Sequence, residues 1–214
     1  TVRGGEAPEK TAGPDAVILL DDDFRGLEVG MFSAPVGAHT EYHFLPEAAP
    51  RGGWNVACFA SGSEAQRAWQ VTEEGDRRVM AQTFDNDRQH THPMVVAGDP
   101  LWQDYGLAVR LAPESDRGST GLVFRYHNNR CYYFFGFQGS RAVLKRVRHE
   151  TAYHRPDEQI LAAKDCTWQK GQEYLASVTV EGRTIRAEMQ NAAGSETGSE
   201  PIAVLRANTE RIMD

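Results

Sequence analysis

Residues 121–148 read GLVFRYHNNRCYYFFGFQGSRAVLKRVR, and this stretch decides the fold class. It holds three runs rich in aromatic and β-branched residues, at 120–126, 131–137 and 141–148, each of strand length. The linkers between them, 127–130 and 138–140, contain Asn128, Asn129 and Gly139. Because asparagine and glycine tolerate the left-handed backbone of tight hairpins, the stretch predicts consecutive hairpins and hence an antiparallel sheet.

Short apolar runs separated by turn residues continue on both sides of this stretch. Further strands are predicted at 54–59, 68–72, 78–83, 105–111, 173–180, 184–190 and 202–205. Turn residues recur roughly every ten positions, which is typical of sandwiches and barrels. Only 64–69 and 157–164 have a helix-like pattern, and each is too short to form a layer. We therefore expect an all-β protein with two antiparallel sheets and few short helical turns.

Composition and length favour one compact domain. The chain has 214 residues, of which 40% are hydrophobic and 25% charged, as in ordinary globular proteins. Residues 1–16 lack apolar periodicity and predict a flexible leader or linker; 17–205 predict the sandwich, and 206–214 a tail or the start of a continuing segment. The longest apolar run is too short to span a membrane.

The excess of acidic over basic residues argues against one class of partner, nucleic acids. Lys and Arg total 23 against 30 Asp and Glu, a net charge of -7, so phosphate backbones are repelled and nucleic acid is not expected to bind. The three cysteines, Cys58, Cys131 and Cys166, show neither metal-site spacing nor a disulfide framework.

The order of elements resembles the concanavalin A-like jelly roll, in particular the laminin G-like sandwiches of bacterial carbohydrate-active proteins. The resemblance covers residues 18–190. It is carried by the following motifs: Asp21-Asp22-Asp23-Phe24, Trp102-Gln103-Asp104-Tyr105, 121–126, Tyr132-Tyr133-Phe134, Leu144-Lys145-Arg146, 168–174 and the hairpin at Gly182.

This resemblance implies a jelly-roll β-sandwich, secreted or periplasmic, that contacts oligo- or polysaccharide on the outer, concave face of one sheet. It requires no cofactor, although related sandwiches hold a structural calcium, for which Asp21 and Asp23 are the candidate ligands. The sequence ends without the closing strands usual in these sandwiches. A longer parent polypeptide or a partner chain is therefore expected to complete the sheet.

Candidate binding residues follow from alternation along the strands. If Leu122 and Phe124 point between the sheets, Arg125 points outward, where its guanidinium would bind a carboxylate or paired hydroxyls. Either Tyr132 or Tyr133 should lie beside it. Alternation alone does not choose between them, and Tyr133 is taken as the candidate.

Basic and imidazole side chains extend the candidate site. Lys145 adds positive charge, which would suit an acidic sugar such as a uronate, although a solvated strand edge balanced by nearby carboxylates is the favoured explanation. His127 follows the same strand as Arg125, and His90 and His92 lie in a long loop at 85–99.

The motifs favour binding over catalysis. The Glu-x-Asp-x-x-Glu spacing of retaining sandwich glycosidases is absent. The residue types needed by a lyase are present, but in no recognisable arrangement. The sequence thus predicts a non-catalytic glycan-binding or ancillary module of a larger polysaccharide-degrading enzyme. A glycoside hydrolase or polysaccharide lyase is the first alternative, and a structural or protein-interaction module the second.

Overall fold

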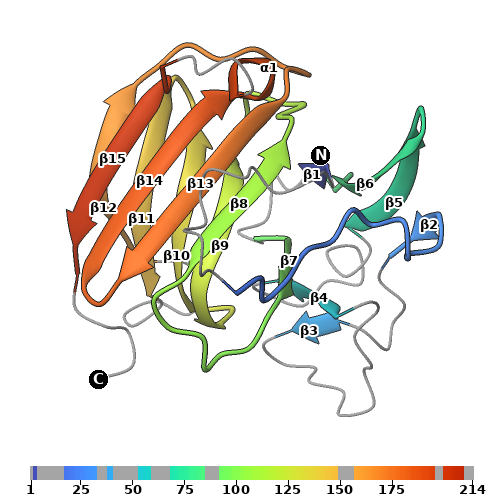
Figure 1. The fold of residues 1–214 in the computed structure, drawn as a ribbon, viewed down its shortest axis with the longest axis horizontal. Coiled ribbons are helices and arrows are strands. Elements are labelled where there is room, and N and C mark those ends of the chain that lie inside the picture. Colours follow the sequence, from blue (N-terminus) through green and yellow to red (C-terminus); the bar gives the residue numbers. More distant parts are fainter. Residues whose placement is uncertain are drawn as a thin grey trace.

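The computed structural model describes residues 2–3, 17–32, 38–40, 53–58, 68–84, 92–148, 157–195 and 200–209. The strands of these residues form three sheets (Figure 1). In spatial order, the eight-stranded sheet contains β15 (Ala203–Asn208), β14 (Thr184–Asn191), β13 (Tyr174–Glu181), β8 (Gly106–Leu111), β1 (Val2–Arg3), β6 (Arg77–Gln82), β5 (Trp69–Glu74) and β2 (Gly30–Met31).

The other two sheets are smaller. The four-stranded sheet contains β12 (Asp157–Asp165), β11 (Arg141–Arg148), β10 (Cys131–Gln138) and β9 (Ser119–Asn128). The three-stranded sheet contains β3 (Ala38–Thr40), β4 (Trp54–Cys58) and β7 (Met94–Ala97), with β3 and β4 parallel. One short helix, α1 (Ala192–Ser195), follows β14, and the described residues include no helix long and apolar enough to cross a membrane.

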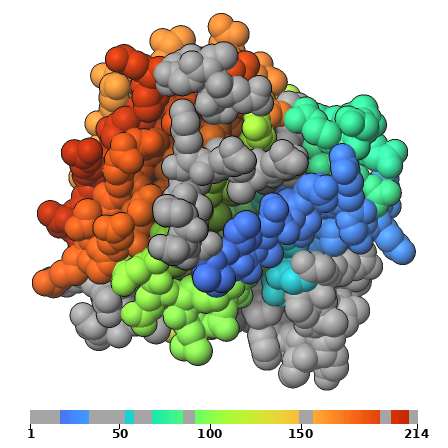
Figure 2. Space-filling model, viewed as in Figure 1, coloured from blue at the N-terminus to red at the C-terminus, as the bar shows by residue number. Residues whose placement is uncertain are grey.

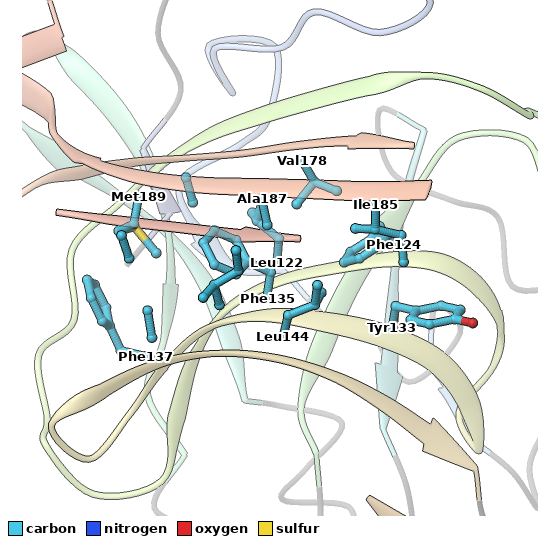
Figure 3. Packing of buried hydrophobic residues seen from close by; sticks show 14 of the residues in the cluster. Leu122, Phe124, Tyr133, Phe135, Phe137, Leu144, Val178, Ile185, Ala187 and Met189 are labelled. Atoms are coloured by element: carbon cyan, nitrogen blue, oxygen red, sulfur yellow. The ribbon is translucent and has the colours of Figure 1, made fainter. Parts of the chain in front are cut away.

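The main core lies between the four-stranded sheet and strands β8, β13, β14 and β15 of the eight-stranded sheet. Figure 3 shows Leu122, Phe124 and Phe135 from one sheet meeting Val178 and Ile185 from the other. All of these side chains are buried, and burying such apolar surface is the main force that holds two sheets together. The protein is therefore all-β, with the face-to-face packing of a β-sandwich.

The three-stranded sheet adds a third layer at one end of the sandwich. Consecutive residues of β4 point to opposite sides of it, as expected for a strand. Val56 packs into a second core with Trp69 and Val71 of β5, whereas Ala57 packs with Met94 against the outer face of the four-stranded sheet. One side of the four-stranded sheet thus faces the main core, and the other is partly covered by this small sheet.

The long hairpins agree with the sequence prediction, and their turns explain why. Gly139 and Gly182 adopt φ values of 58° and 53° at the turns that follow β10 and β13, where other residues would be strained. The prediction of a helical turn at 157–164 is wrong. This segment forms the strand β12, which pairs along its length with β11. The prediction of a helical turn at 64–69 lies mostly outside the described residues, and Trp69 belongs to β5.

Two further elements differ from the sequence prediction. Val2–Arg3, expected within the leader, forms β1 and joins β6 to β8, so among the described residues these two alone make the eight-stranded sheet continuous. Met94–Ala97, expected in a loop, forms β7 and pairs with β4. Both strands are too short for a periodic pattern to reveal them.

Candidate functional site

Chemically reactive side chains gather on the outer face of the four-stranded sheet. Residues directly opposite each other on paired strands share a face, so the register defines rows across the sheet. One row runs Tyr132, Val147, Glu158 and the next runs Phe134, Lys145, Ile160. The outer-face cluster consists of the polar and aromatic members of these rows, the exposed aliphatic Ile160, and the neighbouring His92 and Tyr126: His92, Tyr126, Tyr132, Phe134, Lys145, Glu158 and Ile160.

An ion pair lies at the centre of the cluster. Lys145 Nζ is 2.8 Å from Glu158 Oε2, and it also lies 5.0 Å from the centroid of the Phe134 ring. The Lys145 side chain is 5% exposed and that of Glu158 is 29% exposed. A cation buried this deeply requires a partner, and Glu158 supplies it while keeping contact with solvent.

A second polar pair joins the small sheet to the four-stranded sheet. His92 Nδ1 lies 2.8 Å from the Tyr132 hydroxyl, a hydrogen bond whose donor depends on the histidine tautomer. Burial, then the Glu158 carboxylate and Tyr126, raise the pKa of Tyr132 well above its ordinary value of 10.0. Tyr132 is therefore a neutral hydroxyl at physiological pH.

The ring of Phe134 lies over two glycines. Gly121 and Gly136 face each other on β9 and β10, and a Cβ on either would overlap the backbone of the opposite strand and the tip of the Phe134 ring. Glycine is thus required at both positions because it lets the two strands and the tip of the Phe134 ring approach each other this closely.

Most of this face is covered rather than open. Ala57 and Met94 from the small sheet pack against Tyr132, Phe134, Val143 and Val147, all of which are buried. Ile160 is 51% exposed and Glu158 is partly exposed, whereas His92 and Tyr126 are half-buried, so the most accessible part of the cluster lies on β12. The sequence prediction of a free concave face is therefore replaced by an accessible strip along one strand.

Arg125 does not lie on the outer face, and the prediction that it does is wrong. Between the pairs Phe124–Tyr133 and Asn128–Cys131, β9 has more residues than β10, which makes a bulge. Arg125 has a φ of 44° there, and the alternation breaks. Its side chain instead donates a hydrogen bond to the Gly182 carbonyl of the β13–β14 turn, while its backbone N–H donates to the Tyr105 hydroxyl at 2.9 Å.

Of the remaining predicted binding residues, Lys145 and His92 belong to the outer-face cluster, and Tyr133 and His127 lie elsewhere. Tyr133 is fully buried in the main core, so Tyr132 is the tyrosine on the outer face. Lys145 lies on that face but is buried in its ion pair. His127 is exposed near the end of β9. His92 joins the cluster, whereas His90 lies outside the described residues.

The aspartates at 21–23 make a turn. The Asp22 carboxylate accepts hydrogen bonds from the Phe24 N–H and the Trp54 indole N–H, both at 2.7 Å. Asp23 accepts from the Arg25 N–H and pairs with its guanidinium at 3.5 Å. Asp23 thus already uses its carboxylate within the turn, and the calcium site at Asp21 and Asp23 stays a prediction. The described residues contain no group of three or more His, Cys, Asp or Glu arranged to hold a metal.

Sequence reasoning missed Glu158 and Ile160, the accessible members of the cluster. Both lie in the segment whose pattern was assigned to a helical turn. Read as a strand, it would have placed both residues on one face, because they are two positions apart. The pairing of Glu158 with Lys145 depends on strand register, for which the sequence holds no local signal.

No family model, curated protein or solved structure matches the chain.

Proposed function

We propose that this chain is a non-catalytic, glycan-binding or ancillary module with the concanavalin A-like jelly-roll form of the β-sandwich. The proposal also places it outside the cytoplasm, as a module of a larger polysaccharide-degrading protein. It is supported by the two packed sheets and by the sequence motifs that they contain. Fold alone does not assign function, so the argument depends on the outer-face cluster.

One observation carries the proposal: Glu158 and Ile160 lie side by side on the outer face of β12, and both are accessible. Glu158 offers carboxylate oxygens that accept hydrogen bonds from sugar hydroxyls. Ile160 offers an apolar surface for the C–H face of a sugar ring. Binding sites combine apolar contact area with a few fixed polar groups, and this pair supplies both.

The polar pairs of the cluster favour binding over turnover. A lyase needs a base that readily loses its proton, but burial and Glu158 hold Tyr132 in its neutral form. Lys145 is buried and paired with Glu158 at 2.8 Å, so its ammonium group is not aimed at a reacting atom. The enzyme alternative rests on the His92–Tyr132 hydrogen bond, and it requires product release from a glycan.

A second candidate function, a protein-interaction module, is favoured by a separate feature. Residues Val17, Ile18, Leu19 and Leu20 are consecutive, apolar and all exposed. They begin the blue segment that crosses the face of the molecule in Figure 2. Exposed apolar patches often mark contact surfaces.

The test is glycan binding by an Ile160→Ala variant. We expect the full chain to bind members of an oligosaccharide panel without releasing products, and I160A to weaken that binding about fivefold through the lost apolar contact. Isothermal titration calorimetry measures the affinity, and reducing-end and unsaturated-product assays measure turnover.

Val204→Ala is the matched control, because Val204 is an exposed aliphatic residue on the opposite side of the sandwich, on β15. V204A should bind as the wild type does. Equal affinity of I160A and V204A would reject the β12 surface, product release would favour the enzyme, and absence of all glycan binding would favour the interaction module.

A further inference from the structure

The cations on the outer face of β11 are each matched by a carboxylate on β12. Lys145 pairs with Glu158 at 2.8 Å, and Arg141 Nε pairs with Asp165 Oδ1 at 3.4 Å. Arg141 and Asp165 are cross-strand partners, and Lys145 and Glu158 lie in adjacent rows of the same face. The positive charge that would attract an acidic sugar is therefore engaged within the sheet.

The two members of the Lys145–Glu158 ion pair differ in their exposure to solvent. Lys145 is the inner member, 5% exposed and held against the Phe134 ring, whereas Glu158 is 29% exposed. A ligand that approaches β12 meets the carboxylate first and the ammonium group behind it. The pair thus presents its negative end to solvent.

Because the carboxylate faces solvent, the ion pair should affect neutral and acidic sugars differently. A neutral sugar donates hydroxyl hydrogen bonds to Glu158 and lays its C–H face on Ile160, without disturbing the ion pair. A uronate brings a second carboxylate towards Glu158, whose own carboxylate lies nearer to the ligand than the Lys145 ammonium group behind it, so the two like charges repel each other. The net charge of the chain, -7, adds to this repulsion.

We propose that Glu158 is a specificity-determining residue that makes the β12 surface bind neutral glycans and exclude uronic ones. This inference rests on the proposed glycan-binding function and names the ligand class of that site. From the sequence, Lys145 was compatible with an acidic sugar, because the sequence shows Lys145 but not its partner.

The experiment compares two sets of probes on the full chain: neutral oligosaccharides of β-glucan and xylan, and oligogalacturonate and oligomannuronate. We expect the wild type to bind its best neutral probe at least about tenfold more tightly than any uronate. Glu158→Gln keeps the size of the side chain and removes the repelling charge, so the preference should fall below about threefold.

Asp116→Asn is the matched control. Asp116 forms a surface ion pair with Lys170 at 2.9 Å, so D116N removes the same charge from another ion pair and should keep the wild-type preference. Where E158Q does not fold, because Lys145 then lacks its partner, Lys145→Met combined with Glu158→Gln replaces the ion pair by a neutral pair. That double variant should also show the narrowed preference.

The outcomes separate the two proposals. If the wild type bound uronates as tightly as neutral oligosaccharides, the inference about Glu158 would be overturned, while the proposed glycan-binding function would stand. An unchanged ratio of neutral to uronate affinity in both Glu158 variants would likewise overturn the inference about Glu158. Absence of binding to every probe would reject the proposed function itself, and this inference with it.

Discussion

Phe134 and Phe135 are neighbours on β10, and they lie in two different environments. Phe135 points into the main core, where its neighbours in Figure 3 are apolar. Phe134 points to the outer face, over a pair of glycines and against the Lys145 ammonium group. The inner face of the sheet is filled mainly by hydrocarbon, and the outer face combines hydrocarbon with paired polar groups.

The difference shows how one sheet serves two purposes. The inner face stabilises the fold by burying apolar surface, which is non-directional and tolerates many arrangements. The outer face depends on specific partners, since Lys145 and Tyr132 are buried and each needs a defined acceptor or donor. Stability and specificity are therefore separable by mutation.

The largest expected effect comes from Phe135→Ala. Removing a fully buried ring from the main core should lower the free energy of unfolding by about 3–5 kcal/mol, through lost burial and a cavity. Phe134→Ala should lower the free energy of unfolding by less, because water can enter the cavity that it leaves beside the outer-face cluster. Urea denaturation followed by tryptophan fluorescence measures both, and an equal or larger loss in F134A would contradict the contrast between the faces.

Gly136→Ala should have an intermediate effect. The added Cβ overlaps the Thr120 carbonyl and the Gly121 Cα across the strand pair, so the strands must separate, at a cost of about 1–3 kcal/mol. Gly26→Ala is the control, since nothing lies within 4 Å of a Cβ at that position. Thermal unfolding compares the two variants; a G136A midpoint no lower than that of G26A would show that the close approach of β9 and β10 is not required.

The smallest effect is expected for Tyr132→Phe, and it depends on pH. Near neutral pH the variant loses the His92 hydrogen bond, worth about 1 kcal/mol. The raised pKa means that the folded state keeps the Tyr132 proton above pH 10.0 while the unfolded state loses it, so wild-type stability falls as the pH rises past 10.0. Y132F lacks this loss.

The stability difference between wild type and Y132F should therefore shrink between pH 10 and 11.5, as followed by urea denaturation at each pH. Absorbance at 295 nm reports tyrosinate formation directly. A constant difference across that range would show that Tyr132 ionises normally in the folded protein.

Properties local to one strand were predictable from sequence, and properties of strand pairs were not. Alternation placed Leu122 and Phe124 towards the core, and Asn128, Asn129 and Gly139 marked the hairpin turns. These features depend only on neighbouring residues.

The candidate site depends on register. Arg125 was misplaced because a bulge arises from the unequal lengths of two paired strands, which neither strand reveals alone. Glu158 was missed because its partner, Lys145, is on another strand and its own segment resembled a helical turn. The ligand preferences inferred above follow from these cross-strand partners.

The position of β1 has a consequence for the order of folding. Val2 and Arg3 are synthesised before β6 and β8, yet they pair with both of these later strands. Contacts between residues so far apart in the chain form slowly, because a long loop must close first. Val2 and Arg3 are thus expected to reach their places late, and they complete the eight-stranded sheet only once the strands on either side exist.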